Sequence, residues 1–284
     1  MATLREIKRR IKSINSTAKV THAMELVAAA KMRRSQEKAL LSRPYTNTLS
    51  QVIRYLAPEM HKKRHSLLTR GRGDTQLVIL LSTDRGLVGG LNLNVLRLTR
   101  ESELKNIKFI VVGKKGLSMT AKTGGDIIAS FGSDQQPFLD LARSLTKLAI
   151  DTFKTGEAQN VFIVYPDFQS TIKQVPTITK LLPIELEVIG QEDNQASLPD
   201  YLLFEPSADY ILEKILPHHI LTKIYQALLE AKASEHSARM VAMKNATDAA
   251  NDLVTDLTLT YNQARQEAVT RELLDIITAQ AAFE

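Results

Sequence analysis

The sequence predicts an α/β protein in which a long antiparallel coiled coil of the N- and C-terminal helices carries a small, open, Rossmann-like α/β domain. Three observations predict this fold. The last quarter of the chain contains one proline and no glycine, and its apolar and small residues repeat every seven positions. The first 56 residues carry a second apolar stripe. Between them, apolar runs of strand length alternate with helical patterns.

The C-terminal segment, residues 207–284, is expected to form one continuous helix. At 1.5 Å per residue it would be roughly 110 Å long, so it must extend beyond its own compact domain. Heptads sustained over this length are typical of a helix that supercoils with a partner. One line of the repeat is Met243, Ala250, Leu257 and Ala264, and the other is Met240, Thr247, Val254, Tyr261 and Ala268.

The N-terminal segment, residues 1–58, predicts a partner helix of roughly 80 Å that ends near Leu56. Pro44 is expected to kink or interrupt it. The economical arrangement pairs the two helices with each other, and two separate helices in a larger bundle are the alternative. The seam is expected to begin with Leu4, Ile7, Ile11, Ile14 and Ala18 and to continue, after a small phase shift, with Val20, Met24 and Val27.

Antiparallel pairing predicts which residues face each other. If the helices enter the middle domain near Leu56 and Ala208, Met24 lies opposite Arg239 and Met240. Residues beyond about Gln263 then have no partner on the first helix. Because a lone helix is marginally stable in water, the apolar side chains of this tip imply a socket on another protein. These side chains are Val269, Leu273, Leu274, Ile276 and Ile277.

Residues 75–205 predict the α/β domain. Four strands are expected, at 76–82, 108–112, 126–131 and 161–165. The first is a continuous apolar run, which is typical of a parallel strand buried on both faces. Helices are expected from the turn at 83–92 to about residue 104, near 116–121 and over 137–153. Ile172–Leu182 is expected to be an extended edge segment, because Pro176 and Pro183 limit its pairing.

Composition and charge exclude several classes of protein. The 284-residue chain is 44% hydrophobic and can bury a core, and it has no cysteine for a disulfide or a thiolate metal site. Its apolar runs are too short to cross a bilayer, and its N-terminus lacks the core of a signal peptide; a mitochondrial transit peptide is the alternative interpretation. Residues 1–43 carry a net charge of +8, so the first helix is expected to face an acidic partner.

Two short motifs suggest ligands only weakly. The turn TDRGLVGGLN (83–92) follows a strand and opens a helix, as phosphate sites do. Neither this turn nor Gly113–Gly116 matches a known phosphate-binding pattern, so a tight strand-to-helix turn is the favoured interpretation. His61 and His65 are spaced like a metal pair, but the three basic residues between them would repel a cation, which favours a solvated linker.

No catalytic grouping is recognisable. The chain has no H-E-x-x-H, no G-x-S-x-G and no carboxylate cluster in the α/β segment. The sequence therefore predicts no catalytic residue, no metal and no cofactor. The histidines of the predicted helices are interpreted as surface or packing residues: His22, His218, His219 and His236. The carboxylates Asp248, Asp252 and Asp256 are interpreted as a solvated face, or as partners for the first helix.

Six separated segments carry a resemblance to a known family. They lie at 18–34 (AKVTHAMELVAAAKMRR), 42–45, 82–92, 174–179, 238–248 (ARMVAMKNATD) and 259–266. Together they resemble the gamma subunit of F-type ATP synthase over essentially the whole chain. The resemblance implies a non-catalytic central rotor shaft inside a ring of three alpha and three beta subunits. Its foot would rest on the membrane rotor ring, the c-ring, beside the epsilon subunit, and its rotation would couple ion flow to ATP synthesis or hydrolysis on the beta subunits.

The resemblance also assigns three contact surfaces, residue by residue. The lever loops of the beta subunits, which are acidic in the family, would contact Met24, Lys31, Arg33, Arg85, Val88, Arg239 and Lys244. The upper catch and bearing of the ring would contact Asn262, Arg265, Gln266, Thr270 and Glu272. The epsilon subunit and the rotor ring would contact Arg43, Tyr45, Phe204 and Glu205.

The chain departs from the family pattern at Arg271, where glutamine is usual, and at His236, where a small or amide residue is usual. The expected location is the cytoplasmic face of the bacterial plasma membrane, as a peripheral protein with no span. A nucleic-acid-binding protein with a basic coiled-coil arm is the alternative function, although residues 1–43 contain no aromatic residue for base stacking. An α/β enzyme with a helical dimerisation arm is disfavoured because no catalytic grouping supports it.

Overall fold

The computed structural model describes residues 4–56, 65–69, 71, 73–184, 205 and 207–281. The chain forms two compact units. The first holds residues 1–29 and 239–284, and the second holds residues 30–238. The predicted domain boundaries at 1–58, 75–205 and 207–284 follow the long helices instead, and they stay a prediction.

The chain has two long helices, as predicted, and each contributes residues to both units. Helix α1 (Leu4–Leu56) has 53 residues and helix α6 (Ala208–Ala281) has 74. Ser207 precedes α6, and its hydroxyl accepts the backbone N–H of Tyr210 at 3.3 Å, which satisfies a donor of the first turn. Helix α1 continues through Pro44 and α6 through Pro217, so Pro44 does not interrupt the first helix.

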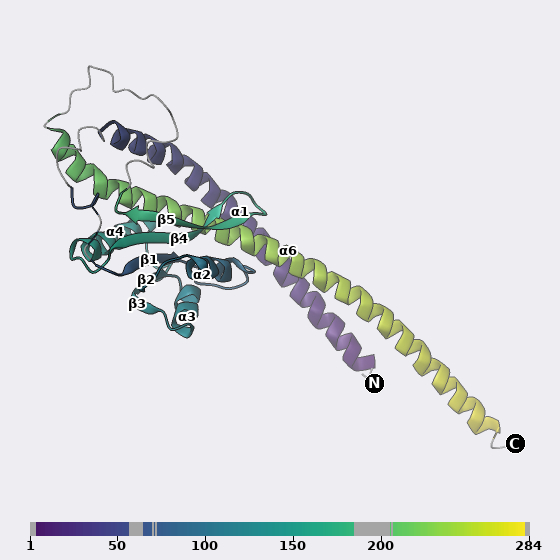
Figure 1. The fold of residues 1–284 in the computed structure, drawn as a ribbon. Coiled ribbons are helices and arrows are strands. Elements are labelled where there is room, and N and C mark those ends of the chain that lie inside the picture. Colours follow the sequence, from purple (N-terminus) through teal and green to yellow (C-terminus); the bar gives the residue numbers. More distant parts are fainter. Residues whose placement is uncertain are drawn as a thin grey trace. The chain divides into compact units, whose positions relative to one another are not determined.

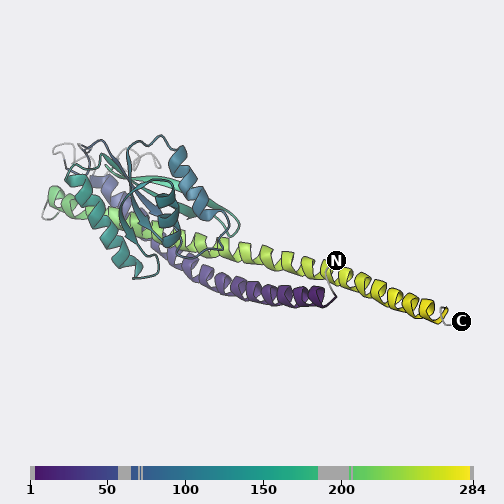
Figure 2. The same ribbon diagram turned by 90° about the horizontal axis from the view of Figure 1, so that it is seen from below.

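In the first unit, the N-terminal half of α1 runs antiparallel to the C-terminal half of α6 (Figure 2). The buried residues of the seam fall on the two apolar positions of a heptad pattern and are mostly small: Ile7, Ala18 and Ala28 on α1, and Met243, Thr247 and Ala250 on α6. The hydroxyls of Thr21 and Thr247 lie 2.7 Å apart across the seam. The predicted register would place Thr21 opposite Met243, so the observed register differs by about one helical turn.

The predicted phase shift of the α1 seam is wrong. Val20 and Val27 are 59% and 56% exposed, and the seam instead keeps its heptad spacing through Thr21 and Ala28. A threonine can occupy the seam because Thr247 hydrogen-bonds its hydroxyl. On α6 the seam ends at Ala264, and the side chains of residues 265–278 are all exposed, as predicted for the tip.

In the second unit, five strands form one mixed sheet in the order β3-β2-β1-β4-β5 (Figure 1). The strands are β1 (Gln76–Leu81), β2 (Ile107–Val112), β3 (Asp126–Phe131), β4 (Asn160–Phe168) and β5 (Gln174–Leu182). Strand β1 pairs in parallel with β2 on one side, where Gln76 faces Ile107, and with β4 on the other, where it faces Asn160. Strand β5 is the antiparallel edge strand, which agrees with the prediction from its prolines.

Helices cover both faces of this sheet. Helices α4 (Phe138–Lys154) and α6 pack on the face that contains Leu77, Ile79 and Leu81. Helices α2 (Leu91–Glu101) and α3 (Lys114–Lys122) pack on the face that contains Val78 and Leu80. Strand β1 is a continuous apolar run because alternate residues enter two different cores.

A buried histidine makes the second unit sensitive to acid. The side chain of His219 on α6 is 1% exposed, and neither ring nitrogen has a hydrogen-bond partner. Burial, together with the nearby charges of Lys223 and His218, lowers its pKa from the ordinary 6.5 to about 3. The folded chain therefore keeps this ring neutral at a pH where the unfolded chain would protonate it.

We predict that the free energy of unfolding falls as the pH drops from 6.5 towards 3, because the unfolded state binds a proton that the folded state excludes. The loss from His219 at about pH 5 should be about 2 kcal/mol. His219→Leu should remove this part of the pH dependence, whereas His218→Leu, at the exposed neighbouring position, should keep it. Urea unfolding of the full chain at several pH values measures the effect. Equal pH dependence in wild type and His219→Leu would contradict the prediction.

Candidate functional site: the glycine-rich turn and the helix surfaces

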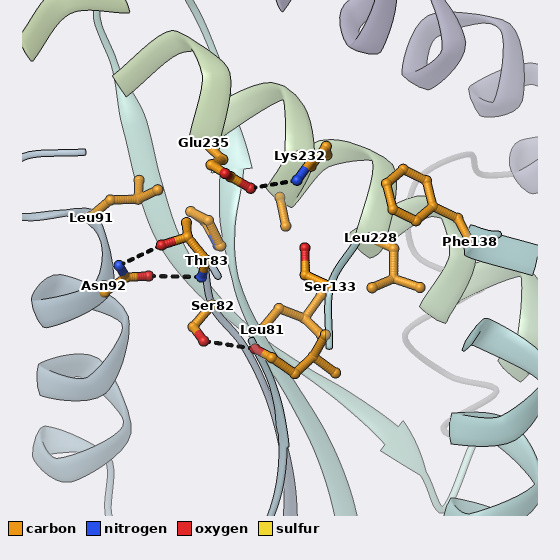
Figure 3. A pocket seen from close by; sticks show the side chains of 13 residues that line it. Leu81, Ser82, Thr83, Leu91, Asn92, Ser133, Phe138, Leu228, Lys232 and Glu235 are labelled. Atoms are coloured by element: carbon orange, nitrogen blue, oxygen red, sulfur yellow. Dashed lines mark hydrogen bonds and ion pairs between the residues drawn. The ribbon is translucent and has the colours of Figure 1, made fainter. Parts of the chain in front are cut away.

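The glycine-rich turn after β1 uses its polar side chains to hold its own backbone. The backbone N–H of Thr83 donates to Asn92 Oδ1 at 3.1 Å, and Asn92 Nδ2 donates to Thr83 Oγ1 at 2.9 Å (Figure 3). The hydroxyl of Thr83 in turn donates to the carbonyl of Arg85 at 2.7 Å. These bonds fix the turn before the chain enters α2, so the two side chains have a structural role.

Asp84 occupies the position at which an anion would bind to helix α3. Its Oδ1 accepts the backbone N–H of Lys114 at 2.9 Å, at the first residue of α3. Its Oδ2 accepts the N–H of Asp134 at 3.0 Å, which holds the segment before α4. A carboxylate is favoured at a helix N-terminus for the same reason that a phosphate is. The chain therefore supplies its own anion here.

The carboxyl ends of the strands enclose a small cavity, and α6 closes it. In open α/β sheets, ligands bind beyond the carboxyl ends where the connections diverge, here between β1 and β4. The cavity is about 20 Å³, which is room for about one water molecule. Lys232 of α6 lines it and bonds Glu235 at 2.9 Å (Figure 3). It also bonds Asp134 at 2.6 Å. This geometry agrees with a structural turn rather than a nucleotide site.

The outer side of the turn presents a residue that the sequence analysis missed. Leu87 is 57% exposed and has a φ of 62°, which is uncommon for a residue with a side chain. Of the two predicted contact residues here, Arg85 is exposed, but Val88 is only 4% exposed and its side chain is not presented to a partner. The repeated glycines indicated a tight turn, but they do not show which apolar side chain points outward.

The predicted lever contacts are divided between the two units. In the first unit, Met24 and Arg239 are half-buried and Lys244 is exposed. Lys244 lines an open groove of about 500 Å³ together with Lys19 and His22 of α1. In the second unit, Lys31 and Arg33 are exposed on α1. The structure thus places these cations on the surface, where exposed charge pairs are worth only about 0–1 kcal/mol each.

The predicted foot contacts have partners inside the second unit. Arg43 Nη2 lies 3.4 Å from Glu230 Oε1 of α6, and the Tyr45 hydroxyl lies 2.6 Å from His218 Nε2. Tyr45 also lines an open groove of about 540 Å³ between α1, α4 and α6. Glu205 is exposed. Phe204 and His61 lie outside the described residues.

The predicted catch and bearing residues lie on the exposed end of α6 in the first unit. Asn262, Arg265, Gln266, Thr270 and Glu272 are all exposed. The apolar residues of the same tip are 51–60% exposed: Val269, Leu273, Leu274, Ile276 and Ile277. Asp248, Asp252 and Asp256 are also exposed, as predicted for a solvated face.

The described residues offer neither a metal site nor a membrane-spanning helix. They contain no group of three or more His, Cys, Asp or Glu side chains that could hold a metal ion. Among the described helices, α1 and α6 included, none has an apolar stretch sufficient to cross a membrane.

Comparison with known proteins identifies the family. Residues 3–283 match the family described as ATP synthase. The ATP synthase gamma chain of Akkermansia muciniphila is 40% identical over 292 residues and that of Opitutus terrae is 39% identical over 293, with 99–100% of each chain covered. The chain therefore belongs to the ATP synthase gamma chain family.

Solved structures share the fold at lower identity. A chain of the Euglena gracilis mitochondrial ATP synthase, in an OSCP/F1/c-ring assembly, matches with a TM-score of 0.69 at 22% identity, over 99% of this chain and 94% of that one. A chain of the Tetrahymena thermophila central stalk and c-ring matches with a TM-score of 0.59 at 24% identity, over 80% of this chain and 99% of that one.

We predict that Gly116→Ala destabilises the second unit by roughly 1–3 kcal/mol through overpacking. A Cβ at residue 116 would lie 2.3 Å from the Ser82 hydroxyl, which is held by the Gly116 N–H at 2.9 Å and the Val112 carbonyl at 2.7 Å. Because alanine has a higher helix propensity than glycine, propensity alone would make Gly116→Ala stabilising. A loss of stability would therefore indicate overpacking. Urea unfolding measures it. Gly86→Ala is the control, because its Cβ would meet only Lys115 Cε at 3.7 Å.

Proposed function

We propose that the chain is the central rotor shaft of an F-type ATP synthase and couples ion-driven rotation to ATP synthesis or hydrolysis on the beta subunits. As a gamma chain it is a non-catalytic subunit of the ATP synthase complex. The full-length match to gamma chains carries the proposal. The paired helices of the first unit support it, because a slim antiparallel pair with an exposed end can stand inside a ring of other subunits.

The proposed partners are three alpha and three beta subunits, the epsilon subunit and the c-ring. One related chain belongs to the rotor of the Euglena gracilis mitochondrial ATP synthase and another to the central stalk and c-ring of Tetrahymena thermophila. The exposed apolar tip of α6 supports a bearing contact, since five large side chains at 51–60% exposure require a socket. The exposed cations Lys31, Arg33, Arg85 and Lys244 support contact with acidic levers.

We also propose that the chain works as a peripheral protein at the cytoplasmic face of a bacterial plasma membrane. The matching gamma chains come from bacteria, among them Akkermansia muciniphila and Opitutus terrae. Attachment to the membrane would come from the c-ring, through the foot surface that includes Arg43, Tyr45 and Glu205.

The proposed function is tested by reconstitution. Tagged beta subunit, alpha subunit and this chain are co-expressed and purified, and ATPase turnover is measured with and without the chain. We expect a complex with three alpha, three beta and one copy of this chain, whose sustained turnover depends on the chain. Lack of association, with retention on random duplex DNA in low salt, would favour the nucleic-acid-binding alternative instead.

We predict that Met24→Lys in the assembled complex impairs coupling of ion pumping to ATP hydrolysis more than it impairs assembly. The new cation would strengthen contact with the acidic levers and so resist rotation at one angle. Proton pumping per ATP hydrolysed, measured in membrane vesicles, should fall severalfold. Leu26→Lys is the control, because it adds the same charge at a position that is 59% exposed and about 200° away around the helix. Wild-type coupling in Met24→Lys would contradict the assigned contact.

A further inference from the structure

A buried lysine of α6 begins a series of polar contacts within the second unit. The side chain of Lys232 is only 12% exposed, and its Nζ donates to Glu235 Oε2 at 2.9 Å and to Asp134 Oδ1 at 2.6 Å. Glu235 lies on the same helix, whereas Asp134 lies in the loop between β3 and α4. The contact with Asp134 therefore joins α6 to a loop at the carboxyl ends of the parallel strands.

The charges at this contact favour the ionised form of both partners. Burial raises the pKa of Asp134, but the hydrogen bond and the charge of Lys232, with other nearby cations, outweigh burial and lower the pKa below its ordinary value. Burial lowers the pKa of Lys232, but Glu235 and Asp134 outweigh it and raise the pKa. A hydrogen bond between two ionised groups is roughly twice as strong as a neutral one.

The loop that holds Asp134 is bonded in turn to the glycine-rich turn. The backbone N–H of Asp134 donates to Asp84 Oδ2 at 3.0 Å, and Asp84 Oδ1 accepts the N–H of Lys114 at 2.9 Å. The N–H of Lys115 donates to the carbonyl of Thr83 at 3.0 Å. The first N–H groups of a helix have no acceptor within the helix, so the turn supplies acceptors for α3. Asp84 thus joins the turn to α3 on one side and to the Asp134 loop on the other.

The side chains that follow Asp84 form the exposed surface of the turn. Arg85 is exposed, and Leu87 is 57% exposed with a φ of 62°. A residue with a side chain keeps such a φ only where the surrounding structure holds it there. The direction in which this surface faces therefore depends on how Asp84 is held.

We propose that Lys232 is a positioning residue, which fixes the exposed turn relative to α6 through Asp134 and Asp84. The positioning is a property of the second unit alone. Its consequence rests on the proposed function: in a rotor shaft, a load that a partner places on the turn would pass to α6 through this ion pair. Lys232 would then act on coupling without touching a partner itself.

Hydrogen exchange in the full-length chain tests the positioning. The amide of Lys114 reports on the turn, because Asp84 is its acceptor. We expect Lys232→Met to speed its exchange severalfold, and Asp84→Ala to speed it about tenfold, as for the loss of one hydrogen bond to a charged group. Lys232→Arg keeps the cation and should keep exchange slow. Ser234→Ala is the matched control, because it removes a bond of 2.9 Å from the same helix to the Pro166 carbonyl on β4.

The amide of Ile79, in the buried centre of β1, separates positioning from a general loss of stability. Unchanged exchange at Lys114 in folded Lys232→Met would overturn the proposal. Equal acceleration at Lys114 and Ile79 would also overturn it, because the whole unit would then have loosened. If Lys232→Met does not fold, Asp134→Ala breaks the same ion pair from its exposed side and is judged by the same two amides.

The consequence for coupling is measured in the reconstituted complex. Proton pumping per ATP hydrolysed should fall severalfold in Lys232→Met, recover in Lys232→Arg and keep its wild-type value in Ser234→Ala. Normal coupling in a Lys232→Met complex whose turn exchanges fast would overturn the transmission of load through Lys232. Failure of the wild-type chain to assemble would instead count against the proposed function, and the exchange result on the free chain would still stand.

Discussion

The packing of α6 against the sheet is the constraint on which the second unit depends. Leu216, Ile220 and Ile224 of α6 are almost fully buried and complete the core over β1 and β4. Without this helix, the part of this apolar face that α4 does not cover would be open to water, which is unfavourable at about 25 cal/mol per Å². The same helix brings Lys232 and Glu235 over the carboxyl ends of the strands, where α/β proteins often bind nucleotides. The sheet has the topology of a ligand-binding fold, but side chains of α6 occupy the position where a ligand would bind.

The first unit is governed by a different constraint, a narrow seam between two helices. Small residues at buried positions, such as Ala18, Ala28 and Ala250, let the two backbones approach closely. Little apolar area is buried per turn, so the pair has a small cross-section and most of its side chains remain on the surface. Eleven basic residues face only three acidic ones within residues 1–43, so most of that charge cannot be neutralised within the segment. Exposed pairs contribute little to stability, and the charge is therefore better explained by contacts with partners.

The sequence predicted the features that depend on local periodicity. The heptads of α6 predict its seam as far as Ala264, although Ala268, the last residue of the second line, is exposed. The apolar run at 76–82 correctly predicts a strand buried on both faces. The apolar pattern favours Val20 and Val27 as seam residues, whereas the seam follows a regular heptad that contains Thr21, whose partner Thr247 is 226 positions away. Val88 was placed on the surface by motif match alone, yet it is buried. Glu230 was not singled out, because its neighbours Arg43 and Asp167 come from distant parts of the chain.

Buried ionisable groups therefore divide the second unit into regions with opposite responses to pH. Burial lowers the pKa of His219, whereas burial and the nearby charge of Asp167 raise the pKa of Glu230. The first group favours the fold at high pH and the second favours it at low pH, so the most stable range lies between the two titrations. Both groups lie on the stretch of α6 that covers the sheet. In a rotor shaft, this is the region where the attachment between foot and helix must withstand torque. The contacts of Glu230 with Arg43 and of Gln226 with the Ala39 carbonyl join α6 to α1 there.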